Sequence, residues 1–263
     1  MNQIGSLAAC QAGGVRKYWN AGAVCQPGLY RQVYSRAAAL VHGLFPVTCY
    51  LCLDPGQKPA LDLCAACEAD LPRNEPACPM CAAAVPEPGE PCRRCRRRNR
   101  AFDAAFAPYR YEFPLPELIL RMKYGGQLPI TRILGCALGR RLADRGAPQV
   151  DAIVPVPLHA ARERKRGYNQ AREIAVFAAR ELELPVEDRL ARRIRETTEQ
   201  TALSAGARRR NLRGAFALNA GALPSRVAIV DDVLTTGATA DALALALRRA
   251  GCRRIEVWAV ARA

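Results

Sequence analysis

The C-terminal part of the chain repeats a simple order of short apolar runs, polar loops and amphipathic stretches. The apolar runs at 151–156, 226–230 and 255–263 have the length of buried strands. The amphipathic stretches at 169–184 and 238–250 space their apolar residues as a helix does. Buried strands that alternate with amphipathic helices indicate an α/β fold, and we predict a parallel, doubly wound sheet.

Weaker patterns precede this region. Alternating aromatic residues at 101–113 predict a pair of strands. Helical spacing at 115–126 and 130–146 predicts two helices, the first of which ends at the Gly-Gly pair 125–126. Between the strand at 151–156 and the next helix, the chain is rich in basic residues and is interpreted as a loop.

The N-terminal part of the chain has a different character. Residues 1–34 show little periodicity and are interpreted as a disordered extension, although a translation start further downstream is an alternative. Residues 35–45 predict a short helix that leads into a Cys-rich segment. We therefore expect three parts: the extension, a Cys-rich module at 35–100 and an α/β domain at 101–263.

Composition narrows the class of protein. The chain has 263 residues, and its 39 Lys and Arg against 24 Asp and Glu leave a net charge of +15. No apolar run approaches the ~20 residues that a membrane span needs, and the first residues lack the pattern of a secretory signal. We expect a cytoplasmic protein, in which the 12 cysteines need an explanation other than disulfides.

Eight of these cysteines form four Cys-x-x-Cys pairs in series. Two such turns place four sulfurs around one tetrahedral ion, so four pairs predict two structural Zn²⁺ ions. A redox motif is disfavoured because four pairs follow one another, and an iron–sulfur cluster is the remaining alternative. The predicted ligands are Cys49, Cys52, Cys64, Cys67, Cys78, Cys81, Cys92 and Cys95.

The sequence around these pairs supports a metal-dependent fold. Residues 49–100 are rich in Pro, Gly and charge and have too few large apolar side chains for a core of their own. We favour sequential pairing, which makes two zinc ribbons, although the spacing allows a crossed pairing equally. The arginines at 93, 94, 96–98 and 100 form a basic patch suited to phosphates.

A second motif follows the strand at 226–230. Two carboxylates, Asp231 and Asp232, come directly after the strand, and a loop rich in Thr and Gly then opens a helix. Backbone N–H groups at a helix N-terminus, with Thr hydroxyls and a Gly, form a phosphate cradle. Carboxylates at the end of a strand can bind ribose hydroxyls or Mg²⁺. Together these features predict a site for a sugar 5-phosphate, and a Walker loop is excluded because its Gly-Lys-Ser/Thr ending is absent.

The run Asp-Asp-Val-Leu-Thr-Thr-Gly-Ala-Thr at 231–239 resembles the phosphoribosyl-pyrophosphate (PRPP) signature of type I phosphoribosyltransferases. The resemblance implies a phosphoribosyltransferase-like domain at 101–263. It also implies that Asp231 and Asp232 are the catalytic pair, which binds the ribose hydroxyls beside Mg²⁺. The residues that would hold the 5-phosphate are Thr235, Thr236, Gly237, Ala238 and Thr239.

The resemblance extends to one branch, the ComF/GntX family. The run Pro-Val-Pro-Leu at 155–158, with Arg162 and the run Lys-Arg-Gly-Tyr-Asn-Gln at 165–170, is similar to a sequence block of that family. The family also shares the run at 193–200, followed by Leu203, Arg208 and Asn211, and the four Cys pairs ahead of the transferase domain. The resemblance covers about residues 44–263. The family is implicated in natural competence and DNA uptake in some bacteria, and its enzymatic acceptor is generally not established.

The residues themselves fit this chemistry. Arg162, Lys165 and Arg166 are cations placed to meet a pyrophosphate, and the Arg- and hydroxyl-rich stretch 193–211 suits a mobile flap, with a solvated basic loop as the alternative. Thr235 stands where transferases for 6-oxopurines carry an Asp base, and because a Thr cannot accept that proton, a 6-oxopurine acceptor is disfavoured. His159 is a candidate for the base, with a role in loop structure or a phosphate contact as the alternative. Lys123 is interpreted as a surface residue.

Two functions are compatible with the sequence. The first is a Mg²⁺-dependent transferase that moves phosphoribose from PRPP to an unknown acceptor. The alternative is a non-catalytic protein of DNA uptake that binds single-stranded DNA through its arginines, or acts as a scaffold, although few aromatic residues are present to stack bases. Proteins of the competence machinery are expected partners, and zinc ribbons could dock another protein in either case.

Overall fold

The computed structural model describes residues 47–57, 61–97, 99–146, 148–195, 212 and 214–263. The expected extension at 1–34, the expected helix at 35–45 and residues 196–211 of the expected flap lie outside the described residues. No helix in the part of the chain that the structure describes is long and apolar enough to cross a membrane.

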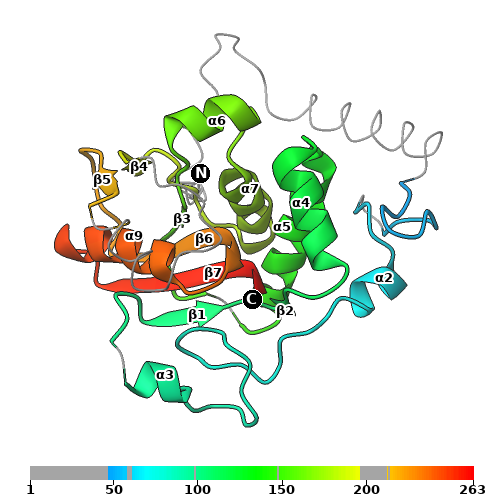
Figure 1. Cartoon of the computed structure of the whole chain (residues 1–263), viewed down its shortest axis with the longest axis horizontal. Helices are drawn as coiled ribbons and strands as arrows, with labels where there is room; N and C mark the ends of the chain where they lie inside the picture. The colour runs from blue at the N-terminus through cyan, green and yellow to red at the C-terminus, as the bar shows by residue number, and fades with distance from the viewer. Residues whose placement is uncertain (1–46, 58–60, 98, 147, 196–211, 213) are drawn as a thin grey trace, which may run out of the picture. The chain divides into compact units, whose positions relative to one another are not determined.

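A parallel sheet forms the centre of the α/β part (Figure 1), with the strand order β1-β7-β6-β3 and with β2 also paired to β7. Every pair in this sheet is parallel, which confirms the prediction of a parallel α/β fold. The apolar runs of the sequence supply its longest strands because they are buried on both faces. The strands are β1 (Ala104–Phe106), β2 (Tyr109–Arg110), β3 (Ala152–Pro155), β6 (Arg226–Leu234) and β7 (Arg254–Arg262).

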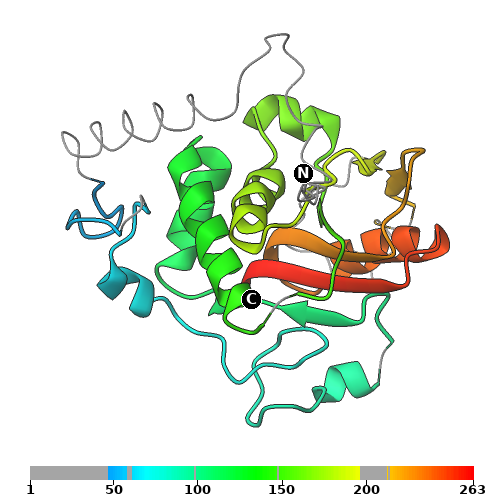
Figure 2. The ribbon, with the colours of Figure 1, turned by 180° about the vertical axis from the view of Figure 1, so that it is seen from behind.

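Helices cover both faces of the sheet (Figures 1 and 2). Because side chains alternate along a strand, Ala228 and Val230 of β6 pack into the core on one face, whereas Val227 and Ile229 pack on the other. The first core contains α4 (Leu115–Tyr124), α5 (Leu128–Ala143) and α7 (Gln170–Leu182). The second contains α9 (Ala238–Arg249), which follows β6 directly.

The aromatic segment at 101–113 forms two strands, as expected, but they do not pair with each other. Strand β1 pairs with residues 256–258 of β7, and β2 pairs with residues 261–262 of the same strand. The two are successive pieces of one sheet edge, separated by Pro108, which has no N–H for a ladder.

The basic segment after β3 is helical, so its interpretation as a loop is wrong. Residues Ala160–Arg166 form α6, in which Nδ1 of His159 accepts a hydrogen bond from the N–H of Ala161 at 3.4 Å. Gly167 ends the helix with a φ of 85°, a conformation that favours glycine. Ala, Arg, Glu and Lys are good helix formers, and their propensity decides the local structure here.

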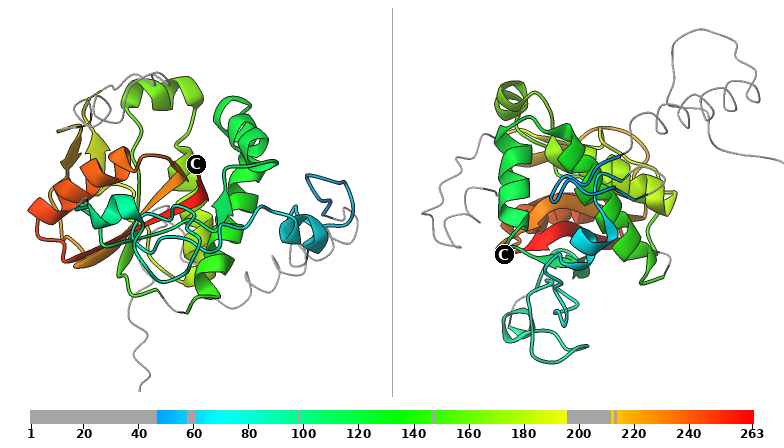
Figure 3. Two further views of the ribbon diagram at one scale, coloured as in Figure 1. Left: turned by 60° about the horizontal axis from the view of Figure 1, so that its bottom comes forward. Right: turned by 90° about the vertical axis from the view of Figure 1, so that its right-hand side faces the viewer.

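A short antiparallel hairpin stands outside the main sheet. Strand β4 (Ala191–Arg193) pairs with β5 (Phe216–Leu218), so the ends of the segment expected to be a flap are joined at its base. Among its described residues, the Cys-rich segment has two short helices, α2 (Ala65–Ala69) and α3 (Arg93–Arg96). Figure 3 shows the turns around α3 beside the C-terminal end of β7, whereas α2 lies apart from them.

Candidate functional site

The eight predicted metal ligands gather into two separate clusters, in each of which the four sulfurs lie within 4.8 Å of one another. We call them site 1 and site 2. The pairing is sequential, so the crossed arrangement that the sequence allowed is not formed. Site 1 consists of Cys49, Cys52, Cys64 and Cys67, and site 2 consists of Cys78, Cys81, Cys92 and Cys95.

The spacing of the sulfurs fits zinc. The Sγ atoms of Cys52 and Cys64 are 3.6 Å apart in site 1, and those of Cys81 and Cys92 are 3.8 Å apart in site 2. A disulfide would need about 2.0 Å. Four sulfurs at ~2.3 Å from a tetrahedral ion lie about 3.8 Å from one another. Both sites are therefore four-Cys zinc-binding sites.

The pKa values of the thiols in site 2 also favour a bound metal ion. Burial and the thiols of Cys81 and Cys92 raise the pKa of Cys95 to about 12. The pKa of Cys92 falls to about 7, because hydrogen bonds from Cys95 and Cys81 outweigh the opposing effect of burial. The four sulfurs of site 2 thus resist simultaneous ionisation, and a bound cation supplies the charge that makes four thiolates stable together.

The two sites have different neighbours. Around site 1, Asp62 forms an ion pair with Arg132 of α5, and Glu68 lies 3.6 Å from Arg140 of the same helix. Cys49 and Cys64 also belong to the core that contains α5. The buried sulfurs of site 2 form a small cluster of their own, close to β7 and to the loop after β6.

Both carboxylates of the second motif lie at the end of β6, which continues to Leu234 instead of ending at Val230 as expected. The Asp232 side chain is only 6% exposed, and its Oδ2 lies 2.6 Å from Nζ of Lys123. A buried carboxylate needs such a partner. The interpretation of Lys123 as a surface residue is therefore wrong. The sequence places Lys123 in the last turn of a predicted helix. It does not reveal the pair with Asp232, because α4 and β6 are far apart along the chain.

The pKa of the Asp231 carboxyl is raised. Burial, and next the charge of Asp232, raise its pKa above the ordinary carboxyl value, although Lys123 acts in the opposite direction. Two adjacent carboxylates with one ammonium group leave an excess of negative charge when both are ionised. The arrangement thus favours either a proton or an additional cation, and carboxylate oxygens are the donors that Mg²⁺ prefers.

The loop after β6 opens directly onto α9. Gly237 has a φ of 75° and caps the helix, and the N–H of Ala238 donates to Oγ1 of Thr236 at 3.3 Å. Thr235 is exposed, and Thr239 is half-buried in the first turn. The backbone N–H groups of residues 235–237 donate to no residue that the structure describes. Free donors at the N-terminus of a helix are suited to bind an anion.

The three cations of the 155–170 block lie on α6. Arg166 donates to Oε1 of Gln170 at 2.6 Å and stacks over Tyr124 of α4, with 5.5 Å between its guanidinium carbon and the ring centre. Arg162 is half-buried and Lys165 is exposed. The contact with Tyr124 ties α6 to the helix that carries Lys123, so basic side chains from two elements flank this edge of the sheet.

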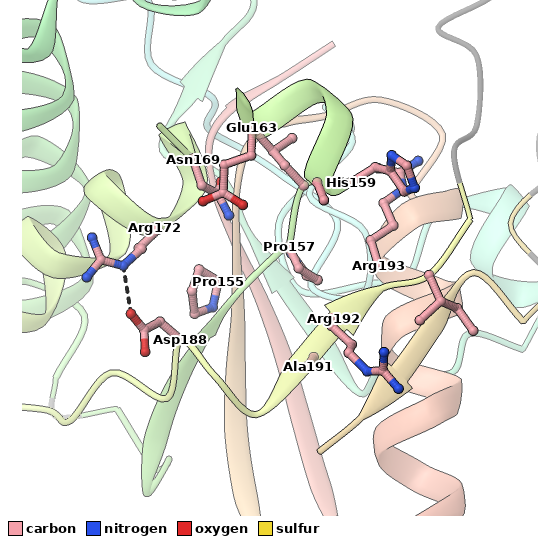
Figure 4. Close-up of a pocket in the computed structure, with 13 residues that line it drawn as sticks. Pro155, Pro157, His159, Glu163, Asn169, Arg172, Asp188, Ala191, Arg192 and Arg193 are labelled. Atoms are coloured by element: carbon pink, nitrogen blue, oxygen red, sulfur yellow. Dashed lines mark hydrogen bonds and ion pairs between the residues drawn. The ribbon is translucent and has the colours of Figure 1, made fainter. Parts of the chain in front are cut away.

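A cavity of about 510 Å³ lies beside the end of β3 (Figure 4). His159 lines it from the N-cap of α6, Glu163 from α6 and Arg192 from β4. The ion pair of Arg172 with Asp188, at 2.7 Å, closes another side. The carboxylates of β6 and the three cations of α6 are not among the described residues that line this cavity. His159 thus serves both as a helix cap and as part of the cavity wall.

The basic patch expected beside site 2 lacks Arg100, and Arg98 lies outside the described residues. Arg93, Arg94, Arg96 and Arg97 are exposed, and Arg96 pairs with Glu90 at 3.0 Å. Arg100 does not belong to the patch, because its side chain is only 2% exposed and forms an ion pair with Asp241 of α9 at 2.8 Å.

Known proteins share this organisation. Residues 40–96 match the double zinc ribbon domain family. The chain is 36% identical over 210 residues to competence protein F of Haemophilus influenzae. The matched region covers 76% of this chain and 90% of that protein. It is 31% identical over 221 residues to the DNA utilization protein YhgH of Salmonella typhi, covering 82% of this chain and 97% of that relative. With Escherichia coli K12 YhgH, the identity is 31% over 223 residues. The chain therefore belongs to the family of competence protein F and YhgH, the ComF/GntX family.

Proposed function

We propose that this protein binds PRPP with Mg²⁺ at the carboxyl end of β6 and transfers phosphoribose to an acceptor that takes part in DNA utilization. The observation that carries the proposal is the pair Asp231 and Asp232 directly ahead of a loop whose N–H groups, at residues 235–237, donate to none of the described residues. The printed names of the relatives, competence protein F and DNA utilization protein, support the biological role. The eight thiolates of the zinc sites favour a reducing, cytoplasmic location.

Different residues of the site bind the 5-phosphate, the ribose and the pyrophosphate of PRPP. The N–H groups of residues 235–237 and the hydroxyl of Thr239 hold the 5-phosphate, and Asp231 accepts hydrogen bonds from the ribose hydroxyls. The two carboxylates would hold Mg²⁺, which would supply positive charge at the leaving pyrophosphate. Lys123 neutralises Asp232 in the ligand-free protein. Lys123 would supply positive charge to the pyrophosphate together with Arg162, Lys165 and Arg166 of α6.

The binding step can be tested by thermal unfolding. PRPP with Mg²⁺ should raise the melting temperature of the wild-type protein, because a ligand that binds only the folded state stabilises it. At 100 times the Kd, the gain is about 2.7 kcal/mol. The double variant Asp231→Ala/Asp232→Ala should show no shift. Ribose 5-phosphate and pyrophosphate, tested separately, are the controls, and an unchanged wild-type melting temperature with PRPP would refute the assignment. Pyrophosphate release across a panel of acceptors would then identify the substrate.

A second function, binding of single-stranded DNA, is supported by the exposed Arg93, Arg94 and Arg97 around α3. We expect Arg93→Ser/Arg94→Ser to weaken binding of an oligonucleotide and to reduce the slope of log K against log salt by about 1.4, since each phosphate contact contributes about 0.7 for a single strand. The measurement is a fluorescence anisotropy titration at several salt concentrations. Arg249→Ser/Arg253→Ser, two exposed arginines elsewhere, is the matched control for net charge. Equal slopes for the two double variants would contradict a role of this patch.

A further inference from the structure

Two arginine side chains join site 2 to the loop after β6. Nη1 of Arg100 donates to the backbone oxygen of Thr236 at 3.0 Å and to Oδ2 of Asp241 at 2.8 Å. Arg262 donates from Nε to the backbone oxygen of Cys81 at 3.1 Å and from Nη1 to that of Leu234 at 2.9 Å. The arginines thus hold both ends of the loop, and Arg262 does so while bound to a ligand residue of site 2.

Arg100 also follows the last ligand of site 2, Cys95, by only five residues. The side chains of Arg100 and Asp241 are 2% and 14% exposed. The N–H of Ala101 binds the other oxygen of Asp241 at 3.2 Å. The chain that leaves site 2 is therefore attached to the first turn of α9 by a buried charge pair and a backbone hydrogen bond.

These contacts orient the donors of the loop. In a planar trans peptide, the C=O group and the following N–H group point in opposite directions. Because Arg100 binds the oxygen of Thr236, the N–H of Gly237 points away from Arg100. Because Arg262 binds the oxygen of Leu234, the N–H of Thr235 points away from Arg262. Both N–H groups are therefore directed away from their arginines, and neither donates to a residue that the structure describes.

We propose that Arg100 and Arg262 are positioning residues through which site 2, and not site 1, sets the shape of the phosphate-binding loop. Loss of metal from site 2 would then weaken binding of a phosphorylated ligand, whereas loss from site 1 would not do so directly. The contacts of site 1 support this difference, since Asp62 and Glu68 are paired with α5 and not with the loop. The identity of the ligand rests on the proposed function, but the coupling of site 2 to the loop does not.

The first part of the test severs the arginine contacts. Arg100→Gln and Arg262→Gln should each weaken binding of PRPP with Mg²⁺ by about tenfold or more, because hydrogen bonds from a charged donor are lost. Arg132→Gln, which breaks the pair with Asp62 beside site 1, is the matched control and should leave the affinity within about twofold. Isothermal titration calorimetry measures the affinity, and metal analysis verifies that each variant retains two zinc ions, as expected from the two four-Cys sites.

The second part needs no ligand. Amide hydrogen exchange at the start of α9, where the N–H of Asp241 donates to the oxygen of Gly237 at 2.8 Å, reports the order of the loop directly. Exchange there should be faster in Arg100→Gln and in Cys95→Ser than in the wild type, and unchanged in Cys67→Ser, which removes one ligand of site 1. The double variant Arg100→Gln/Asp241→Asn removes both charges of the pair, so faster exchange in that variant reports loss of the contact of Arg100 with the loop and not the cost of a single buried charge.

The outcomes separate the two proposals. If the wild-type protein does not bind PRPP, the proposed function fails, and the exchange data still decide the coupling. If the wild-type protein binds PRPP while Arg100→Gln and Arg262→Gln bind it equally well, and exchange at the start of α9 is unchanged in Cys95→Ser, the coupling is refuted.

Discussion

Replacement of Gly237 by alanine is expected to weaken binding of PRPP by about 100-fold or more. Gly237 has a φ of 75°, and an L side chain in this region costs about 1–2 kcal/mol. A Cβ atom would also lie 2.7 Å from Nη1 of Arg100, so that the guanidinium would have to leave the oxygen of Thr236 or the loop would have to move. Either change disturbs the N–H groups that we propose to bind the phosphate.

Gly251→Ala is the matched control for this substitution. Gly251 lies just beyond the other end of α9 with a φ of 106°, and a Cβ there would meet no atom within 4 Å. The control should therefore show the backbone strain without the collision: a lower melting temperature, but an affinity for PRPP close to that of the wild type. Calorimetric titration of both variants provides the comparison. Equal affinities for Gly237→Ala and the wild type would show that the close approach of Arg100 to the loop is not needed.

The second large effect is expected for Asp231→Asn, which should stabilise the ligand-free protein and abolish binding of PRPP with Mg²⁺. Burial and Asp232 raise the pKa of Asp231 above its ordinary value of 3.8, so above that pH the folded state retains a proton that the unfolded state releases. The free energy of unfolding of the wild type should therefore fall as the pH rises from about 5 to about 8. Asparagine carries no charge, so the variant should lose this dependence and melt a few degrees higher at the upper end, about 2–4 °C for each kcal/mol.

Asp151→Asn should behave in the opposite way. The hydrogen bond from Arg226 lowers the pKa of Asp151, so its carboxylate stabilises the folded state at neutral pH and its removal should lower the melting temperature. Thermal melts of the three proteins between about pH 5 and about pH 8 test both signs. An Asp231→Asn protein that is less stable than the wild type at the upper end of this range would contradict the assigned charge balance, even if it no longer binds ligand.

Arg100 connects the Cys-rich module with the α/β domain across the boundary predicted at residue 100. Residue 100 was expected to end the Cys-rich module, yet its side chain is buried against the loop and the first turn of α9. Arg248 of α9 in turn pairs with Asp103 in the segment that follows. Residues 100–103 are thus part of the support for α9, and a truncation placed at residue 100 would remove a contact of the loop after β6.

The sequence by itself determined the features whose signal is local. The spacing of four Cys pairs specified the eight metal ligands, because two sulfurs of one turn can reach one ion. The apolar runs and helical periodicities specified the main strands and helices, because burial on a face repeats with the period of the element. The acidic pair and the Thr-Gly loop lie on consecutive residues, so their juxtaposition at the end of β6 needed no long-range information.

The tertiary structure alone decided which distant groups meet. The spacing of the Cys pairs allowed two pairings, and the separate positions of the turns around sites 1 and 2 selected one. The partner of Asp232 is Lys123 from a helix far away in the sequence, and Arg100 and Arg262 reach the loop from a turn and from the last strand. A side chain with a long, flexible stem has no periodicity that reveals its partner, because its contact depends on how the elements pack. The chemistry of this site was therefore visible in consecutive residues, whereas its support came from residues that only folding brings together.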